Sequence, residues 1–135
     1  MGIIIKTPEQ IEGIRKSSHL AAETLKFLEK HIKPGITTLA LNDLAEKFMR
    51  DHGAIPATKG YKGFKFASCI SPNDVVCHGV PNDYELQWGD IVNVDVTTIL
   101  DGYYGDTCKM YVVGEASEYA QKLMSVTREC LKKGL

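Results

Sequence analysis

The stretch IVNVDVTTILDGYYGDTCKMYVV, residues 91–113, consists of two strand-like runs on either side of Asp101-Gly102. An Asp-Gly pair between two such runs is typical of a β-hairpin with a two-residue turn. In that hairpin Leu100 lies opposite Tyr103, and the pairing continues outward from there one residue at a time. The sequence therefore predicts a long antiparallel hairpin whose register is set by its turn.

This register places two carboxylates on the same face of the hairpin. Asp95 lies opposite Cys108 and Thr97 lies opposite Asp106, and opposed residues share a face because side chains alternate along a strand. Asp95 and Asp106 are then diagonal neighbours, about 7–8 Å apart at the backbone. That separation suits the two ions of a binuclear metal site, which lie about 3.5–4 Å apart. Polar residues that are merely hydrated on a solvent-facing strand would show the same pattern, so the hairpin alone leaves both interpretations open.

The other residues of the hairpin favour a metal site slightly. The opposite face of its first strand is apolar and is expected to rest on helices; it consists of Val92, Val94, Val96 and Leu100. Ionised carboxylates in so apolar a strand are costly unless a cation compensates them. No Lys or Arg alternates onto their face between Asn93 and Asp106. Two aspartates cannot complete such a site, so carboxylates and a histidine from elsewhere are required, and the metal is not specified.

Two helices are predicted before the hairpin. Thr7-Pro8-Glu9-Gln10 has a capping threonine, a proline at the first helical position and a capping-box glutamine. The inward stripe of this helix runs to Lys33-Pro34-Gly35 and consists of Ile11, Ile14, Ser18, Ala21, Leu25, Leu28 and Ile32. The second helix begins at Thr37 or Thr38 and ends at Gly53. Its inward side carries Leu41, Leu44, Ala45 and Phe48.

The rest of the chain completes an α+β pattern. Strand periodicity and turn signals predict an antiparallel meander over residues 57–113, and a third helix begins near Ser117. The residues that this helix is expected to turn inward are Ala120, Leu123, Met124, Thr127 and Leu131. We therefore expect a single domain over residues 1–135, in which helices cover one face of an antiparallel sheet.

Composition and charge limit the partners. Sixteen basic and seventeen acidic residues give a net charge of -1, which indicates neither nucleic acid nor an anionic membrane as partner. A peptide or small molecule fits better. The longest apolar run near the start, Ile3-Ile4-Ile5, is too short for a signal peptide core or a membrane span, so we expect a cytoplasmic protein.

The four cysteines, Cys69, Cys77, Cys108 and Cys130, are expected to be free thiols, because no CxxC pair and no export signal is present. Cys69 and Cys77 flank a turn and could imitate a zinc site together with His78. The usual spacing of zinc ligands is absent, so this alternative is the weaker one.

Two stretches, SCISPNDVVCHGVP at residues 68–81 and GDIVNVDVTTILDGYYGDTCKMYVVG at residues 89–114, closely resemble the bacterial type I methionine aminopeptidases of the M24 peptidase family. The similarity extends over the whole chain. It implies half of a pita-bread (creatinase/aminopeptidase-like) fold, namely the N-terminal half of the catalytic domain without its C-terminal half. It also implies a hydrolase that removes the initiator methionine from nascent proteins and peptides in the cytoplasm.

The resemblance also implies roles for individual residues. Asp95 and Asp106 match the first two metal-ligating aspartates, with Asp106 the bridging one, in a site for two divalent ions: cobalt, manganese, iron, zinc or nickel. Thr97 would orient a metal ligand without binding the metal itself. His78 matches a histidine that contacts the substrate, although without the motif a hydrogen-bonded structural histidine is the preferred interpretation.

Tyr61, Phe64 and Cys69 match positions that line the pocket for the methionine side chain, and soft, aromatic walls suit a thioether. From the residues alone, ordinary strand-core packing explains them as well. Family members take a histidine and two glutamates from their second half. After Asp106 the chain has only Glu115, Glu118 and Glu129 and no histidine, so we expect the isolated chain to be inactive.

Two other functions remain open at this point. One is a related pita-bread peptidase, such as one that cleaves before proline. The other is a non-catalytic half-fold that dimerises about a twofold axis through its exposed apolar face and free sheet edge.

Overall fold

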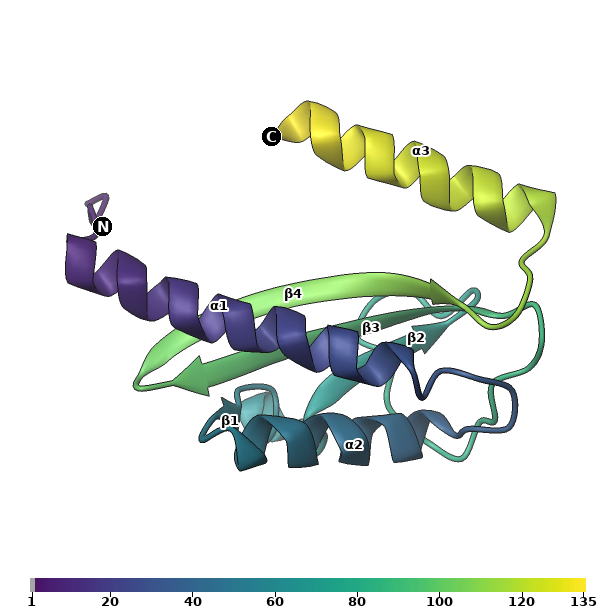
Figure 1. Ribbon diagram of the computed structural model, residues 1–135, viewed down its shortest axis with the longest axis horizontal. Helices are drawn as coiled ribbons and strands as arrows, with labels where there is room; N and C mark the ends of the chain where they lie inside the picture. The colour runs from purple at the N-terminus through teal and green to yellow at the C-terminus, as the bar shows by residue number, and fades with distance from the viewer. Residues whose placement is uncertain (1) are drawn as a thin grey trace.

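A four-stranded antiparallel sheet carries two helices on one face, in a computed structural model that describes residues 2–135 (Figure 1). The helices on the sheet are α1 (Pro8–Glu29) and α2 (Thr38–Asp51). The strands are β1 (Ile55–Pro56), β2 (Ser68–Pro72), β3 (Ile91–Leu100) and β4 (Tyr103–Val112); a short 3-10 helix spans Tyr61–Gly63, and α3 (Glu118–Gly134) ends the chain. This is the predicted α+β architecture. Within the described part, none of the helices combines the length and apolar character that a bilayer span requires.

The predicted hairpin is confirmed, register included. Leu100 pairs with Tyr103, and β4 stays paired with β3 along its whole length. Asp101 and Gly102 both have positive φ, 52° and 82°, as a type I′ turn requires. On its other side β3 pairs with β2 and, near its end, with β1. The predicted meander over residues 57–113 is therefore right for β2, β3 and β4, but residues 57–67 and 73–90 form no strand of the sheet.

Helix α1 begins at the predicted capping box, which is confirmed. The Thr7 hydroxyl accepts from the Gln10 N–H at 3.3 Å, and the Gln10 side chain accepts from the Thr7 N–H at 2.9 Å. The buried face is shifted from the predicted stripe and consists of Ser17, Leu20, Ala21, Thr24, Leu25 and Leu28, while Ile11 is 46% exposed. Ser17 and Thr24 are buried because their hydroxyls have hydrogen-bond partners, which a hydropathy pattern cannot show.

Helix α1 approaches the sheet closely at Gly105 of β4. A Cβ at Gly105 would collide with the backbone of Ser17 and Ser18. Around this contact the Ser17 hydroxyl donates to the Thr98 carbonyl at 3.1 Å, and the Thr98 hydroxyl donates to the Ser17 carbonyl at 2.9 Å. Thr98 and Gly105 are opposed residues in the hairpin. Helix α1 therefore contacts β3 and β4 at the same pair of opposed residues.

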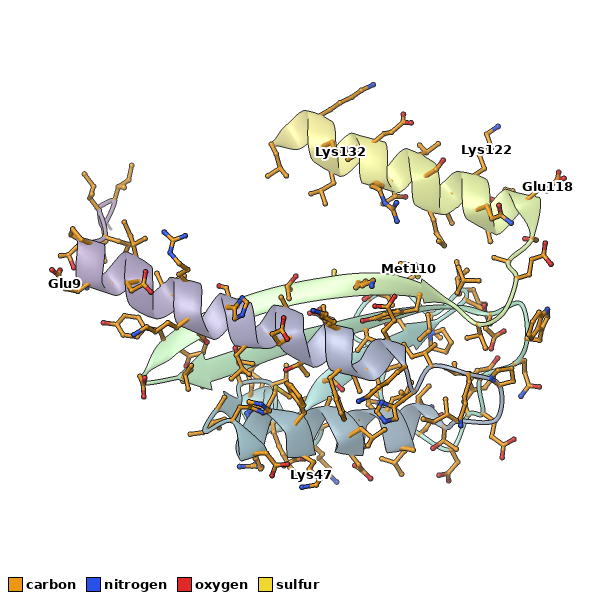
Figure 2. The ribbon with its side chains drawn as sticks, viewed as in Figure 1. Glu9, Lys47, Met110, Glu118, Lys122 and Lys132 are labelled. Atoms are coloured by element: carbon orange, nitrogen blue, oxygen red, sulfur yellow. The ribbon has the colours of Figure 1, made fainter. Side chains whose placement is uncertain are left out.

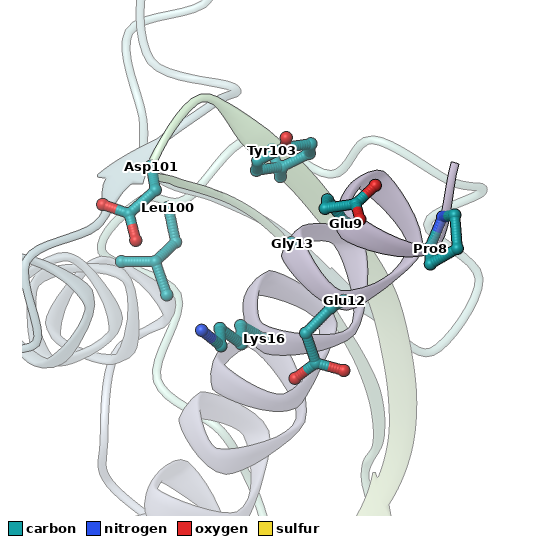
Figure 3. Close-up of a pocket in the computed structure, with 8 residues that line it drawn as sticks. All are labelled: Pro8, Glu9, Glu12, Gly13, Lys16, Leu100, Asp101 and Tyr103. Carbon is teal, nitrogen blue, oxygen red and sulfur yellow. The ribbon is translucent and has the colours of Figure 1, made fainter. Parts of the chain in front are cut away.

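The tip of the hairpin also lies against α1. A Cβ at Gly13 would collide with the ring of Tyr103, so a larger residue there would require the ring or the helix to move. Figure 3 shows the pocket beside this contact, which is lined by Pro8, Glu9, Glu12, Gly13, Lys16, Leu100, Asp101 and Tyr103.

Helix α2 positions β2 through a buried asparagine. The Asn42 side-chain oxygen accepts from the N–H groups of Ala67 and Ser68, at 2.9 and 3.2 Å. Of the predicted inward residues Leu41 and Ala45 are buried, whereas Leu44 and Phe48 are only partly buried. The helix is followed by Gly53 with φ 79°, the predicted left-handed terminator.

Helix α3 begins after Ser117 as predicted, but the prediction that it buries a face is wrong. No residue of α3 is buried, and Leu123 and Leu131 are 51% and 64% exposed. Figure 2 shows Glu118, Lys122 and Lys132 along a helix that lies apart from the sheet. Its apolar stripe has nothing to pack on within residues 2–135, so the periodicity identified a face that needs a partner and not a face that has one.

The loop over residues 73–90 is held by the carboxylate of Asp90. It accepts from the Asn73 amide at 2.9 Å, the Tyr84 hydroxyl at 2.9 Å and the Gln87 N–H at 2.8 Å. Burial alone would raise the pKa of Asp90, but these three donors outweigh it and hold the pKa below its ordinary value. The hydrogen bond that the Tyr84 hydroxyl donates to Asp90 also raises the pKa of Tyr84.

We predict that Gly105→Ala lowers the free energy of unfolding by about 1–3 kcal/mol, because the new methyl group must push α1 away from the hairpin. Urea unfolding measures the change. Gly134→Ala is the control, since nothing lies within 4 Å of the methyl group that it adds. Equal stability of both variants would contradict the tight contact.

We predict that Asp90→Asn lowers the free energy of unfolding by about 1–3 kcal/mol at neutral pH. The amide nitrogen of asparagine is itself a donor, so it cannot accept the hydrogen bonds that the carboxylate oxygen accepts. Because the pKa of Asp90 is lowered in the folded state, its ionised carboxylate stabilises the protein at pH values above the ordinary carboxyl pKa of about 3.9. This stabilisation is lost as the pH falls through the folded-state pKa of Asp90. The difference between wild type and variant in urea unfolding should therefore narrow in acid. The control is Asp83→Asn, at an exposed position in the same loop; a pH-independent difference would refute the assignment.

Candidate metal and peptide site

One cavity of about 530 Å³ is lined by all seven residues that the sequence singled out. It opens on the face of the sheet that α1 and α2 do not cover. The predicted residues that line it are Tyr61, Phe64, Cys69, His78, Asp95, Thr97 and Asp106, and the others are Ala57, Thr58, Lys62 and Tyr104. Residues from β2, β3, β4 and two loops therefore meet at one place.

The floor of the cavity is the β3–β4 hairpin. Thr97 pairs with Asp106 and Asp95 pairs with Cys108, so the predicted sharing of a face is confirmed. Asp95 is partly buried and Asp106 is exposed. Both aspartates line the cavity, whereas Cys108 does not. The apolar face opposite is buried as predicted, with Val92, Val94 and Val96 in the core.

The surroundings of Asp95 disfavour its ionisation. Burial raises the pKa of Asp95, and the charge of Asp106 raises it further, while His78 partly opposes both effects. No ion pair joins either aspartate to a Lys, Arg or His among residues 2–135. A divalent cation between the carboxylates would remove their repulsion, and oxygen donors suit such an ion. The donor set therefore fits a metal, but it is incomplete: within the described range no three His, Cys, Asp or Glu side chains are placed to hold one.

Cys69 forms the wall next to the floor, because β2 places it opposite Asp95. Burial, with smaller contributions from Asp95, Cys77 and Asp106, raises the pKa of the Cys69 thiol to about 11. The thiol is therefore neutral at physiological pH and acts as a soft apolar surface instead of a thiolate ligand. All four cysteines are free, as predicted, and Cys77 is exposed, so the zinc alternative has no support.

His78 is held at the cavity by the residue that follows it. Gly79 lies so close to β2 that a Cβ there would collide with the Ile70 carbonyl. Its carbonyl accepts from the Ile70 N–H at 2.9 Å, and its N–H donates to the Ser71 hydroxyl at 3.0 Å. His78 itself has φ 59°, a left-handed conformation that is uncommon outside glycine and that clusters at functional sites.

The remaining wall comes from the segment before β2. Tyr61 begins the 3-10 helix and is 65% exposed, while Phe64 follows it and is partly buried. Phe64 packs edge-on against Phe66, with ring centroids 5.8 Å apart. Tyr61 therefore lies at the mouth of the cavity, and Phe64 and Cys69 lie deeper.

Tyr104 and Lys62 are among the cavity residues that the sequence did not single out. Tyr104 follows from the hairpin register, because it lies two residues before Asp106 and so faces the same side. Lys62 has no such signal. It reaches the cavity through the turn between Gly60 and Gly63, whose path depends on tertiary structure.

The comparisons with known proteins agree on one family. The model of metallopeptidase family M24 matches residues 12–135. The chain is 50% identical over 135 residues to a methionine aminopeptidase of Rickettsia prowazekii, covering 100% of this chain and 52% of the relative. It thus spans about half the length of the curated relatives that it matches.

Solved structures give the same result for the fold. The crystal structure of the R. prowazekii methionine aminopeptidase superposes with a TM-score of 0.97 at 50% identity, covering 98% of this chain and 54% of that one. An Xaa-Pro dipeptidase from Bacillus anthracis superposes with a TM-score of 0.82 over 93% of this chain and 34% of that one. At 23% identity it shows a shared fold alone.

We predict that the full chain binds Mn²⁺ weakly and that Asp106→Asn weakens this binding at least tenfold, because one of only two carboxylate donors is lost. Equilibrium dialysis measures the affinity. Asp101→Asn is the matched control, since it removes a charge from the same hairpin outside the cavity and Asn-Gly is itself a favoured turn. Equal weakening by both variants would show that only net charge matters.

Proposed function

Because the chain belongs to metallopeptidase family M24, we propose that residues 1–135 form the N-terminal half of the catalytic domain of a methionine aminopeptidase. The whole enzyme would remove the initiator methionine from nascent proteins and peptides in the cytoplasm. The observation that carries this proposal is the single cavity in which Asp95, Asp106 and His78 meet a soft, aromatic wall. The 50% identity to the R. prowazekii enzyme over the full length of the chain supports the choice of substrate.

Asp95 and Asp106 would hold two divalent ions, with Asp106 between them. Bound ions of this kind supply Lewis-acid activation of a carbonyl and lower the pKa of a water molecule. The chain's own part is to bring two carboxylates together on one face of a hairpin, where neither forms an ion pair with another residue of the described range 2–135. Thr97 pairs with Asp106 across the hairpin and would orient it. Cobalt, manganese, iron, zinc and nickel all remain candidates for the ion.

His78 would steady the reacting amide of the substrate. A histidine N–H that donates to the carbonyl oxygen stabilises the negative charge that develops there. Its fixed backbone beside β2 suits that role, because donors that are already in place need no reorganisation during the reaction. The methionine side chain would lie against Tyr61, Phe64 and Cys69, where the neutral thiol and the rings provide the polarisable surface that a thioether prefers.

The two aspartates do not complete a two-metal site, so residues 1–135 alone should release methionine at a negligible rate. The additional ligands would come from a second half, which the relatives have in their other 48% of length. Cleavage before proline is less well supported, because the resemblance to Xaa-Pro enzymes is confined to the fold.

Self-association is the second candidate. The exposed apolar side chains of α3, among them Tyr119, Leu123 and Val126, and the unpaired edge of β4 are its basis. Light scattering separates the two proposals, since a dimer that forms only with Mn²⁺ would support an assembly role and a monomer under all conditions would not.

We predict that a chimera is active in which residues 1–135 replace the matching half of the R. prowazekii enzyme. It should release methionine from Met-Ala-Ser in the presence of Mn²⁺ or Co²⁺ and leave Xaa-Pro peptides intact. His78→Ala in the chimera should lower kcat about 10²-fold to 10³-fold, the range for loss of one oxyanion donor.

Thr58→Ser in the chimera is the control, because it keeps the hydroxyl that donates to the Phe66 carbonyl. A folded chimera that cleaves Xaa-Pro but not methionyl peptides would overturn the assignment. So would stoichiometric release of methionine by residues 1–135 alone.

A further inference from the structure

Among residues 2–135, Lys62 and His78 are the basic side chains that line the cavity. Lys62 comes from the exposed turn that also carries Tyr61, and it lines the same cavity as Asp95 and Asp106. Within residues 2–135 Lys62 has no acidic partner, because none of the six ion pairs includes it. Its ammonium group lies over the ring of Tyr61, 5.4 Å from the centroid. A cation is therefore present at the mouth with no carboxylate assigned to it.

The conformation of the turn fixes the position of the Lys62 backbone. Lys62 has φ 47°, a left-handed conformation that non-glycine residues rarely adopt. The turn around it is closed by hydrogen bonds: the Gly60 N–H donates to the Phe64 carbonyl at 2.7 Å, and the Phe64 N–H donates to the Tyr61 carbonyl at 2.9 Å. Backbone strain held in place by surrounding bonds is common where a side chain has a functional task.

A peptide whose first residue lies in the cavity must leave through the mouth. Its amino end would lie near Asp95 and Asp106, and the methionine side chain near Phe64 and Cys69. The second and third residues would then pass the mouth, about 3.3–3.6 Å further out for each residue. The long, flexible stem of a lysine covers such a range and presents a compact charge at its end.

We propose that Lys62 binds a carboxylate at the third position of the substrate, so that the site prefers methionyl peptides with Asp or Glu at that position. The inference rests on the proposed function for the direction in which the peptide lies. The chemistry of the recognition rests on Lys62 alone, since no other Lys or Arg of the part that the structure describes lines the cavity.

Binding of amidated peptides to the ¹⁵N-labelled full chain tests this proposal, because it requires no catalytic activity. Met-Ala-Glu-NH₂ should bind about two- to fivefold more tightly than Met-Ala-Gln-NH₂ at low salt, the range of an exposed ion pair, and the preference should fade near 0.5 M NaCl, taken as roughly the concentration at which exposed charges are screened. Chemical shifts of the Tyr61–Gly63 turn report the binding site.

Lys62→Asn should abolish the preference while keeping the left-handed backbone, which asparagine tolerates. Lys62→Arg should retain it. Lys65→Asn is the matched control, because Lys65 is exposed in the same segment and does not line the cavity. A preference that survives in Lys62→Asn, or that disappears equally in Lys65→Asn, would overturn the proposal.

The peptide Gly-Ala-Glu-NH₂ separates this inference from the proposed function. If it binds as tightly as Met-Ala-Glu-NH₂ and the preference for Glu still depends on Lys62, the carboxylate site stands and the methionine pocket does not. If methionyl peptides bind more tightly but Glu and Gln are equivalent, the pocket stands and the role of Lys62 is refuted. Absence of binding by every peptide would count against both.

Discussion

The register of the β3–β4 hairpin is the constraint on which the rest of the structure depends. It is fixed at the tip by Asp101-Gly102, whose two positive φ angles close a two-residue turn. It is fixed again on the helix side, where Ser17 of α1 bonds to Thr98 and leaves no room for a side chain at Gly105. Because side chains alternate along a strand, a slip of one residue would move every group on β4 to the opposite face.

The helix contact and the candidate site are consequences of the same pairing. Thr98 and Gly105 are opposed, and the next pair along the hairpin is Thr97 and Asp106. The first pair faces α1 and the second faces the cavity, since neighbouring pairs point to opposite sides. The contact that anchors the helix therefore lies directly behind the aspartate that we assign to the metal. Packing on one face sets the direction of a functional carboxylate on the other without touching it.

The sequence predicted those features that local chemistry decides. The turn, the hairpin register, the capping box at Thr7 and the shared face of the two aspartates follow from residue type and from the period of two. The sequence did not predict features that depend on residues far away in the chain. Ser17 is polar yet buried because Thr98 satisfies it, and Lys62 reaches the cavity along a turn that no periodicity describes. Helix α3 has the pattern of a buried face without a surface to cover it, because amphipathicity records a need for burial and does not name the partner.

The two faces of the sheet also divide stability from function. The buried core lies between the sheet and the helices α1 and α2, and includes no residue of α3. The open face carries the cavity. There, burial and the charge of Asp106 both raise the pKa of Asp95, so its ionised form is unfavourable in the folded protein. A cation bound between the carboxylates would offset this repulsion, because oxygen donors suit such an ion. Packing therefore accounts for the core, whereas the carboxylates of the open face need a compensating charge that the protein itself does not supply within residues 2–135.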